Sequence, residues 1–340
     1  MKPPKKTHSK AIVKPRAKTS APTATPSRSH GQGSNAAPME RVVWAVDPFA
    51  ADLGIEARTG AVLHALGSKL TRVQPVYLVP APEDAVLGSQ PVDARSPWGQ
   101  RTLERIGQVV AKAKVKAEAP KLLTQPGNSM QLAAAELVTF ARAENAQLIA
   151  VGTHSRKGPA RWFLGSFAET LLLTSPLPVL VANPRSTERR AVKRILFPTD
   201  FTDNSREAFA WVKSLAKQLG VELHLFHRNL MDRDPARIPF EPPAVPEALW
   251  LRLQEGRLST GRQWLEEARA SGIKAQLHVS RSRASVAEAV SASAKRLAPC
   301  MIVLASHGNV VASKLLGSVA RQVVRDAPCP VLVIPPRRGT

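Results

Sequence analysis

Short apolar runs alternate with longer stretches of helical periodicity along most of the chain. The first run, residues 41–46, ends at Asp47-Pro48, and the next, residues 76–79, follows a stretch whose apolar residues recur at helical spacing. Such alternation is typical of parallel strands connected by helices. The sequence therefore predicts an α/β fold. In the first half, the expected strands are 41–46, 76–79, 122–123, 148–151 and 179–181, and the expected helices are 57–70, 103–117, 130–144 and 164–174.

The second half repeats this order of elements. Asp200 lies 153 residues after Asp47, and Gly317 lies 152 residues after Gly165. A repeat of this length indicates duplicated domains rather than a solenoid. We therefore expect a tail (1–38), a first domain (39–184, copy one), a linker (185–191) and a second domain (192–337, copy two). In copy two the expected strands are 195–197, 222–226, 275–279, 301–304 and 331–334, and the expected helices are 205–219, 248–270, 284–297 and 318–325.

Each copy carries a polar loop between its fourth strand and its last helix. In copy one the loop runs from Gly152 to Gly165-Ser166, and in copy two it runs from Ala305 through Gly308 to Gly317-Ser318. A strand that passes through such a loop into a helix start directs backbone amides at an anion. Both loops are therefore candidate phosphate-binding loops.

Both copies resemble the universal stress protein family. That family carries a Gly-x2-Gly-x9-Gly-Ser/Thr loop after its fourth strand and a Pro-Val-Leu-Val fifth strand, which residues 178–181 and 330–333 match. The resemblance implies two tandem open parallel-sheet domains, Rossmann-like and similar to adenine-nucleotide alpha-hydrolases. It also implies that the two final strands pair, so that the copies pack as an internal pseudo-dimer. Any further self-association would then need another surface.

The resemblance also implies an adenine nucleotide, ATP, at the carboxyl ends of the strands. The aspartate that ends the first strand would contact the adenosine, a valine at the end of the second strand would pack on the base, and the glycine loop would hold the phosphates. The residues expected to bind nucleotide are Asp47, Val79, Gly152, His154, Arg156, Gly165 and Ser166 in copy one, and Thr199, Asp200, Gly308, Gly317 and Ser318 in copy two.

Departures from the family pattern favour copy one as the nucleotide site. Copy one replaces the second loop glycine with Ser155 but keeps nine residues before Gly165. Copy two replaces the first loop glycine with Ala305, keeps only eight residues between its last two glycines, and has Arg228 where the base-packing valine is expected.

Structural interpretations of the same residues stay open. Ser166 and Glu169 have the spacing of a capping box, so Ser166 could simply start a helix. Asp47 and Asp200 could be turn formers. A degenerate stress protein that binds no nucleotide is therefore an alternative.

Composition adds a second candidate partner. The chain of 340 residues has 48 Lys and Arg against 26 Asp and Glu, a net charge of +22, and residues 1–38 hold eight basic residues and no acidic one. This tail has few large apolar residues, so we expect a disordered basic arm. An alternative function is a nucleic-acid-interacting scaffold that uses the arm. With only Cys300 and Cys329 and no apolar stretch long enough to span a membrane, a reduced, cytoplasmic protein without a membrane partner is expected.

Motifs of catalysis and metal binding are missing from the sequence. Residues 256–261 have the glycine spacing of a Walker motif, but Arg262-Gln263 follows instead of Lys-Ser/Thr, and the segment lies in a helical pattern. His154 and His307 recur in the two loops without other metal-ligand residues at suitable spacing, so no protein-bound metal is expected. The expected function is a stress-responsive ATP-binding sensor or regulator rather than an enzyme, although weak ATP hydrolysis stays open.

Removal of residues 1–38 is expected to leave the Tm of the remaining chain unchanged, because this tail has too few apolar residues to contribute to a core. Differential scanning calorimetry of the full-length and truncated proteins checks this. A fall of several degrees on truncation would contradict the expectation of a disordered arm.

Overall fold

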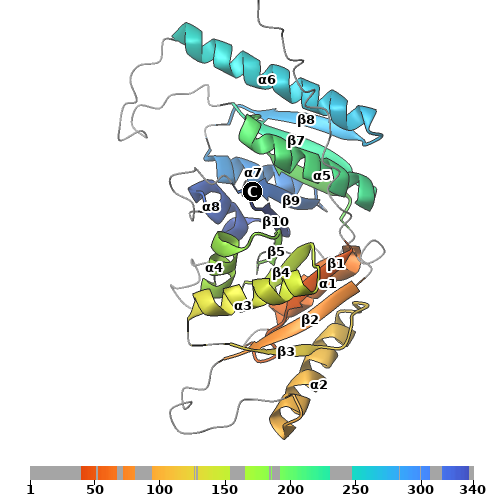
Figure 1. Cartoon of the computed structure of the whole chain (residues 1–340). Coiled ribbons are helices and arrows are strands. Elements are labelled where there is room, and N and C mark those ends of the chain that lie inside the picture. The colour runs from red at the N-terminus through yellow and green to blue at the C-terminus, as the bar shows by residue number, and fades with distance from the viewer. Residues whose placement is uncertain are drawn as a thin grey trace, which may run out of the picture. The chain divides into compact units, whose positions relative to one another are not determined.

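The computed structural model describes residues 40–50, 53–66, 72–80, 94–125, 127, 129–153, 165–183, 185, 192–229, 247–282, 284–298, 300–306 and 316–336. The basic tail and most of both glycine loops lie outside these residues. The described strands form a ten-stranded sheet in the order β3-β2-β1-β4-β5-β10-β9-β6-β7-β8 (Figure 1). The first five strands come from copy one and the last five from copy two.

Copy one alternates strands and helices in sequence order. All strand pairs within it are parallel, and the strand order changes direction between β1 and β4. The elements are β1 (Arg41–Ala45), α1 (Gly54–Leu66), β2 (Arg72–Val79), α2 (Pro97–Lys112), β3 (Lys121–Thr124), α3 (Met130–Ala143), β4 (Leu148–Gly152), α4 (Ser166–Thr174) and β5 (Val179–Ala182).

Copy two has the same parallel topology, so the expected α/β fold class is confirmed. Among the helices that the structure describes, none has the length and apolarity that a membrane crossing requires. The elements are β6 (Arg194–Pro198), the short 3-10 helix η3 (Asp203–Ser205), α5 (Arg206–Leu219), β7 (Glu222–Arg228), α6 (Glu247–Ala270), β8 (Ala275–Ser280), α7 (Val286–Arg296), β9 (Cys300–Ala305), α8 (Ser318–Asp326) and β10 (Val331–Ile334).

One strand is clearly longer than the sequence pattern indicated. Strand β2 begins at Arg72 rather than at Val76, because it pairs with β1 from Arg72 onward, and Gln74 and Pro75 are buried in it although neither continues an apolar run. Strand β3 pairs with β2 only from Val76 onward. Before that point, the Gln74 side chain donates a hydrogen bond to the Ala119 carbonyl (2.7 Å). A polar side chain thus replaces part of the missing strand pairing.

Buried side chains form a layer on each face of the sheet. Helices α1, α2, α5 and α6 contribute to the layer that contains Trp44, and α3, α4, α7 and α8 contribute to the layer that contains Val43. Neighbouring residues of a strand therefore face opposite layers, as the two-residue period of a strand requires. Because helices cover both faces, a ligand site is expected where the strands end.

The two copies meet through their last strands. Strands β5 and β10 are antiparallel, with Val181 opposite Val331, Leu180 opposite Leu332 and Val179 opposite Val333. This pairing is the contact that an internal pseudo-dimer requires.

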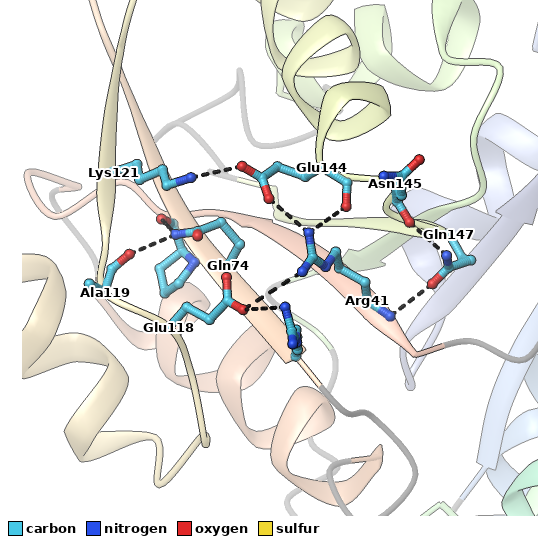
Figure 2. A network of polar contacts seen from close by, with 10 residues as sticks. Arg41, Gln74, Glu118, Ala119, Lys121, Glu144, Asn145 and Gln147 are labelled. Atoms are coloured by element: carbon cyan, nitrogen blue, oxygen red, sulfur yellow. Dashed lines mark hydrogen bonds and ion pairs between the residues drawn. The ribbon is translucent and has the colours of Figure 1, made fainter.

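A polar network ties the amino ends of the copy-one strands together (Figure 2). The Arg41 guanidinium, at the start of β1, donates to the Glu144 carbonyl (2.7 Å) and to the Glu144 carboxylate (2.8 Å). Lys121, at the start of β3, donates to the other oxygen of that carboxylate (2.7 Å). The hydrogen bond from Lys121, with the nearby positive charges, lowers the pKa of Glu144. The network lies at the strand ends opposite the expected site, which indicates a structural role.

Copy two has a pair of histidines on adjacent strands. Atom Nδ1 of His224 lies 2.8 Å from Nε2 of His278, and Nε2 of His224 lies 3.4 Å from the Glu222 carboxylate. A carboxylate only accepts, so His224 Nε2 donates to it, and His278 donates to His224 Nδ1. Burial lowers the pKa of both imidazoles below the ordinary 6.5. The pair is therefore most compatible with two neutral rings.

The histidine pair is expected to weaken the fold in acid. Both pKa values are lowered in the folded state, so the unfolded chain takes up protons first, and stability falls as the pH drops below about 6.5. The substitution His278→Gln keeps a donor for His224 without a titrating group, so it is expected to reduce the loss of Tm between neutral and mildly acidic pH. Replacement of exposed His64 by Gln is the control. An equal effect of both substitutions would contradict the prediction.

Candidate functional site

Copy one has a cavity of about 720 Å³ at the carboxyl ends of its strands. The ends of β1, β2 and β4 and the first turns of α1, α3 and α4 contribute to its wall. The cavity thus lies where the strand order changes direction, between β1 and β4. In open α/β sheets this switch point is the usual place for a ligand.

The structure brings four of the expected copy-one residues together on the cavity wall. They are Asp47, Gly152, Gly165 and Ser166. Expected residues His154, Arg156 and Gly308 lie outside the described residues.

At the end of β2, Leu78 rather than the expected Val79 lies on the cavity wall. Leu78 lines the cavity, whereas Val79 is absent from its wall and is 3% exposed. The Val46 amide donates to the Val76 carbonyl, and in copy two the Thr199 amide donates to the Phe226 carbonyl in the same way. Val76 and Phe226 are therefore equivalent, and two residues further along the strand Leu78 is equivalent to Arg228. The expected equivalence of Val79 and Arg228 is therefore wrong by one residue.

The Asp47 carboxylate both shapes a turn and faces the cavity. Its Oδ1 accepts a hydrogen bond from the Phe49 amide (2.9 Å), which is the turn-forming role considered from the sequence. Burial, with a smaller contribution from Asp47, raises the pKa of the neighbouring Tyr77 to about 12. Tyr77 therefore keeps its proton at neutral pH and presents a hydroxyl beside a carboxylate.

Sequence analysis missed a buried carboxylate on the same wall. Glu56, in the first turn of α1, is 1% exposed and accepts a hydrogen bond from the Asp47 amide (3.3 Å). An acidic residue in the first turn of a helix is common, because it complements the helix dipole. The sequence therefore gives no sign that Glu56 is buried beside Asp47 rather than exposed at the start of a helix.

Gly152 is required by packing within the protein. A Cβ at this position would overlap Cγ2 of Ile55 and lie 3.3 Å from Oγ1 of Thr59, both on α1. In copy two, strand register equates Gly152 with Ala305. The buried positions of α1 and α5 coincide at an offset of 153 residues, which equates Ile55 with Ala208. The smaller Ala208 makes room for the alanine, so Ala305 is explained without reference to a phosphate.

The first turn of α4 lies on the cavity wall. Gly165 is the N-cap of this helix, with φ −54°, and among the residues that the structure describes no side chain caps the helix. Ser166 is the first helical residue, so the capping-box interpretation of Ser166 is wrong. The wall therefore includes an uncapped helix start, whose amides and dipole favour an anion.

The corresponding end of copy two is held by local contacts. The Asp200 Oδ1 accepts hydrogen bonds from the Thr202 amide (3.2 Å) and from the hydroxyls of Thr202 and Ser205 (both 2.8 Å). Thr199 is buried, and its Oγ1 accepts from the Phe201 amide (3.0 Å). The turn-forming role thus describes Asp200 well. Gly317 and Ser318 start α8 as Gly165 and Ser166 start α4.

Two further residues of copy two have structural partners. The Arg228 guanidinium donates to the Ser282 carbonyl (3.1 Å). Gly261 of the Walker-like segment lies inside α6, where a Cβ would lie 2.8 Å from the Phe201 ring. Gly261 therefore allows α6 to pack closely on Phe201. This agrees with the sequence, in which the segment lacks the Lys-Ser/Thr of a Walker motif. Among the described residues no group of three or more His, Cys, Asp or Glu side chains could hold a metal ion.

The fold is that of two tandem open α/β domains, and comparison with known proteins gives the family. The model of the universal stress protein family matches residues 39–183 and 191–335. The chain belongs to the universal stress protein family. A universal stress protein of Methanocaldococcus jannaschii is 28% identical over 148 residues, which cover 42% of this chain and 81% of that protein.

Solved structures agree with this fold over most of the chain. A universal stress protein from Archaeoglobus fulgidus has a TM-score of 0.57 at 20% identity and covers 87% of this chain and 96% of its own. A functionally unknown protein from Pseudomonas aeruginosa has a TM-score of 0.55 at 14% identity, with coverage of 90% and 95%. At these identities the similarity shows the fold alone.

Gly152→Ala is expected to destabilise the protein by about 1–3 kcal/mol, because the added methyl group overpacks the contact with Ile55. Ile55→Ala alone leaves a cavity and is expected to cost about 2–5 kcal/mol. Together the two substitutions reproduce the Ala208–Ala305 combination of copy two, so the double variant is expected to lose less than the sum of the single losses. Denaturant unfolding of the four proteins checks this. Strict additivity would contradict the packing explanation of Gly152.

Proposed function

We propose that this universal stress protein binds an adenine nucleotide, ATP, in the copy-one cavity and acts as a stress-responsive sensor or regulator. The cavity at the strand switch point, with Asp47 and the uncapped start of α4 on one wall, is the observation that carries the proposal. Its volume lies within the range of about 300–1,000 Å³ that is usual for small-molecule sites.

Each part of the wall matches one part of a nucleotide. Leu78 offers an apolar surface to the base, and the Asp47 carboxylate accepts hydrogen bonds from the sugar hydroxyls. The amides at the start of α4 receive phosphate oxygens, and the helix dipole adds to the attraction. The described wall offers carboxylates, apolar groups, the Tyr77 hydroxyl and helix amides, which are groups that can hold a nucleotide, so the proposal concerns binding.

In this proposal copy two does not bind a nucleotide. Arg228 takes the place of Leu78, and the Asp200 carboxylate is engaged by Thr202 and Ser205. The Arg228 guanidinium is held at the Ser282 carbonyl (3.1 Å) and does not offer the apolar surface that Leu78 offers in copy one. We therefore expect one nucleotide per chain, bound by copy one.

Isothermal titration calorimetry with ATP tests the proposal on the full-length chain. Gly165→Val is expected to weaken binding at least about tenfold, because the side chain hinders the approach of phosphate to the α4 amides. Gly317→Val is the matched control at the start of α8. Both glycines have φ −54°, which any residue adopts, so neither substitution strains the backbone.

The outcomes of this titration separate the parts of the proposal. Absence of binding by the unmodified protein would refute nucleotide binding. A stoichiometry of two per chain, or an equal loss from both substitutions, would refute the assignment to copy one. Unchanged affinity in Gly165→Val would refute the role of the α4 amides.

A further inference from the structure

The contact between the copies is symmetric in its backbone. Leu180 and Leu332 occupy equivalent positions of the two copies and lie opposite each other, and the flanking valines pair symmetrically on either side. This is the arrangement of a two-fold contact, in which each residue near the axis faces its own equivalent. The side chains beside this strand pair, however, do not obey that symmetry.

The first departure is an ion pair between equivalent positions. Glu169 and Arg321 each lie in the first helical turn, and their amides bond to the carbonyls of Gly165 and Gly317 at the same distance of 2.9 Å. The Arg321 Nε atom lies 3.2 Å from Glu169 Oε1. Equivalent positions thus carry opposite charges and meet across the contact.

The second departure is a buried amide. The Asn183 side chain, which is 1% exposed, donates hydrogen bonds to the carbonyls of Val324 (3.0 Å) and Ala327 (3.1 Å) at the end of α8. The equivalent residue of copy two, one position after β10, is Pro335, whose side chain has no donor. The amide therefore bridges the copies in one direction only.

A third contact completes this asymmetric set. The Arg185 guanidinium, two residues after Asn183, lies 2.9 Å from Oδ1 of Asp326 at the end of α8. Both ion pairs are partly exposed, so each contributes modestly, whereas the buried hydrogen bonds of Asn183 are costly to lose. The Glu169–Arg321 pair needs copy one on one side and copy two on the other. The Asn183 amide is supplied by copy one alone, and Asp326, whose equivalent in copy one is Thr174, is supplied by copy two alone.

We propose that the β5 edge is specific for the β10 edge, so that the partner of copy one is copy two and not a second copy one. A contact between two copy-one edges would place Glu169 against Glu169. A contact between two copy-two edges would place Arg321 against Arg321 and would lack the Asn183 amide. Charge complementarity, added to a shared strand register, thus directs the two halves of the chain to each other.

Charge reversal in the full-length protein reproduces these wrong contacts. Glu169→Arg creates the arginine–arginine contact of two copy-two edges, and Arg321→Glu creates the glutamate–glutamate contact of two copy-one edges. Each variant is expected to lower the Tm by about 2 °C or more. The double variant, which exchanges the two charges, is expected to recover most of the loss. At about 1 M salt, where the screening length is about 3 Å, the single losses are expected to shrink.

Arg269→Glu is the matched control. This residue forms an exposed ion pair with Glu266 (3.1 Å) and donates to the Ala275 carbonyl (3.3 Å), so its reversal removes only local contacts and does not touch the contact between copies. It changes the net charge by −2, as Arg321→Glu does, so it is matched to that variant. Asn183→Ala is expected to lower the Tm independently of salt, because it removes buried hydrogen bonds. Single reversals no more damaging than the control, or a double variant no more stable than the single ones, would overturn the proposal. All of these variants are compared by Tm, so they test the specificity of the contact between β5 and β10 even if the protein binds no nucleotide.

Discussion

The close contact between the end of β4 and the start of α1 sets the geometry of the copy-one cavity. Because Gly152 has no side chain, Ile55 packs directly against the backbone of β4. The same approach brings Glu56 to the amide of Asp47 and onto the cavity wall. A packing requirement is therefore sufficient to explain the first glycine of the loop, and Glu56 on the cavity wall depends on that packing for its position.

The order and type of the strands and helices could be predicted because helices cover both faces of the sheet. A parallel strand buried on both faces appears as a continuous apolar run, and the duplicated order supported each assignment. The expected helix 103–117 was nevertheless misplaced, since α2 runs from Pro97 to Lys112, with Ser96 as its N-cap. The start of β2 could not be predicted, since Gln74 and Pro75 interrupt the apolar pattern, and on the β3 side a side-chain hydrogen bond takes the place of strand pairing there.

The wall of the candidate site was harder to predict than the fold. Here the family motif placed the expected base-packing residue one position too far along the chain. Adjacent strand residues face opposite sides of the sheet, so that one-residue difference separates Leu78 on the cavity wall from buried Val79. Glu56 escaped notice because its burial depends on the packing of α1, which no local pattern reports.

Duplication within one chain removes a constraint that a dimer of identical chains must obey. In such a dimer, a residue near the two-fold axis meets itself, so a charge there is repelled by its copy. Here the equivalent residues have diverged to Glu169 and Arg321, and Glu169 also lines the copy-one cavity. Without Arg321, the Glu169 carboxylate would repel phosphate near the start of α4. In the proposed function, the pair that distinguishes the two edges therefore also offsets an unfavourable charge at the phosphate end of the cavity, and the proposed copy-one site then depends on a side chain of copy two.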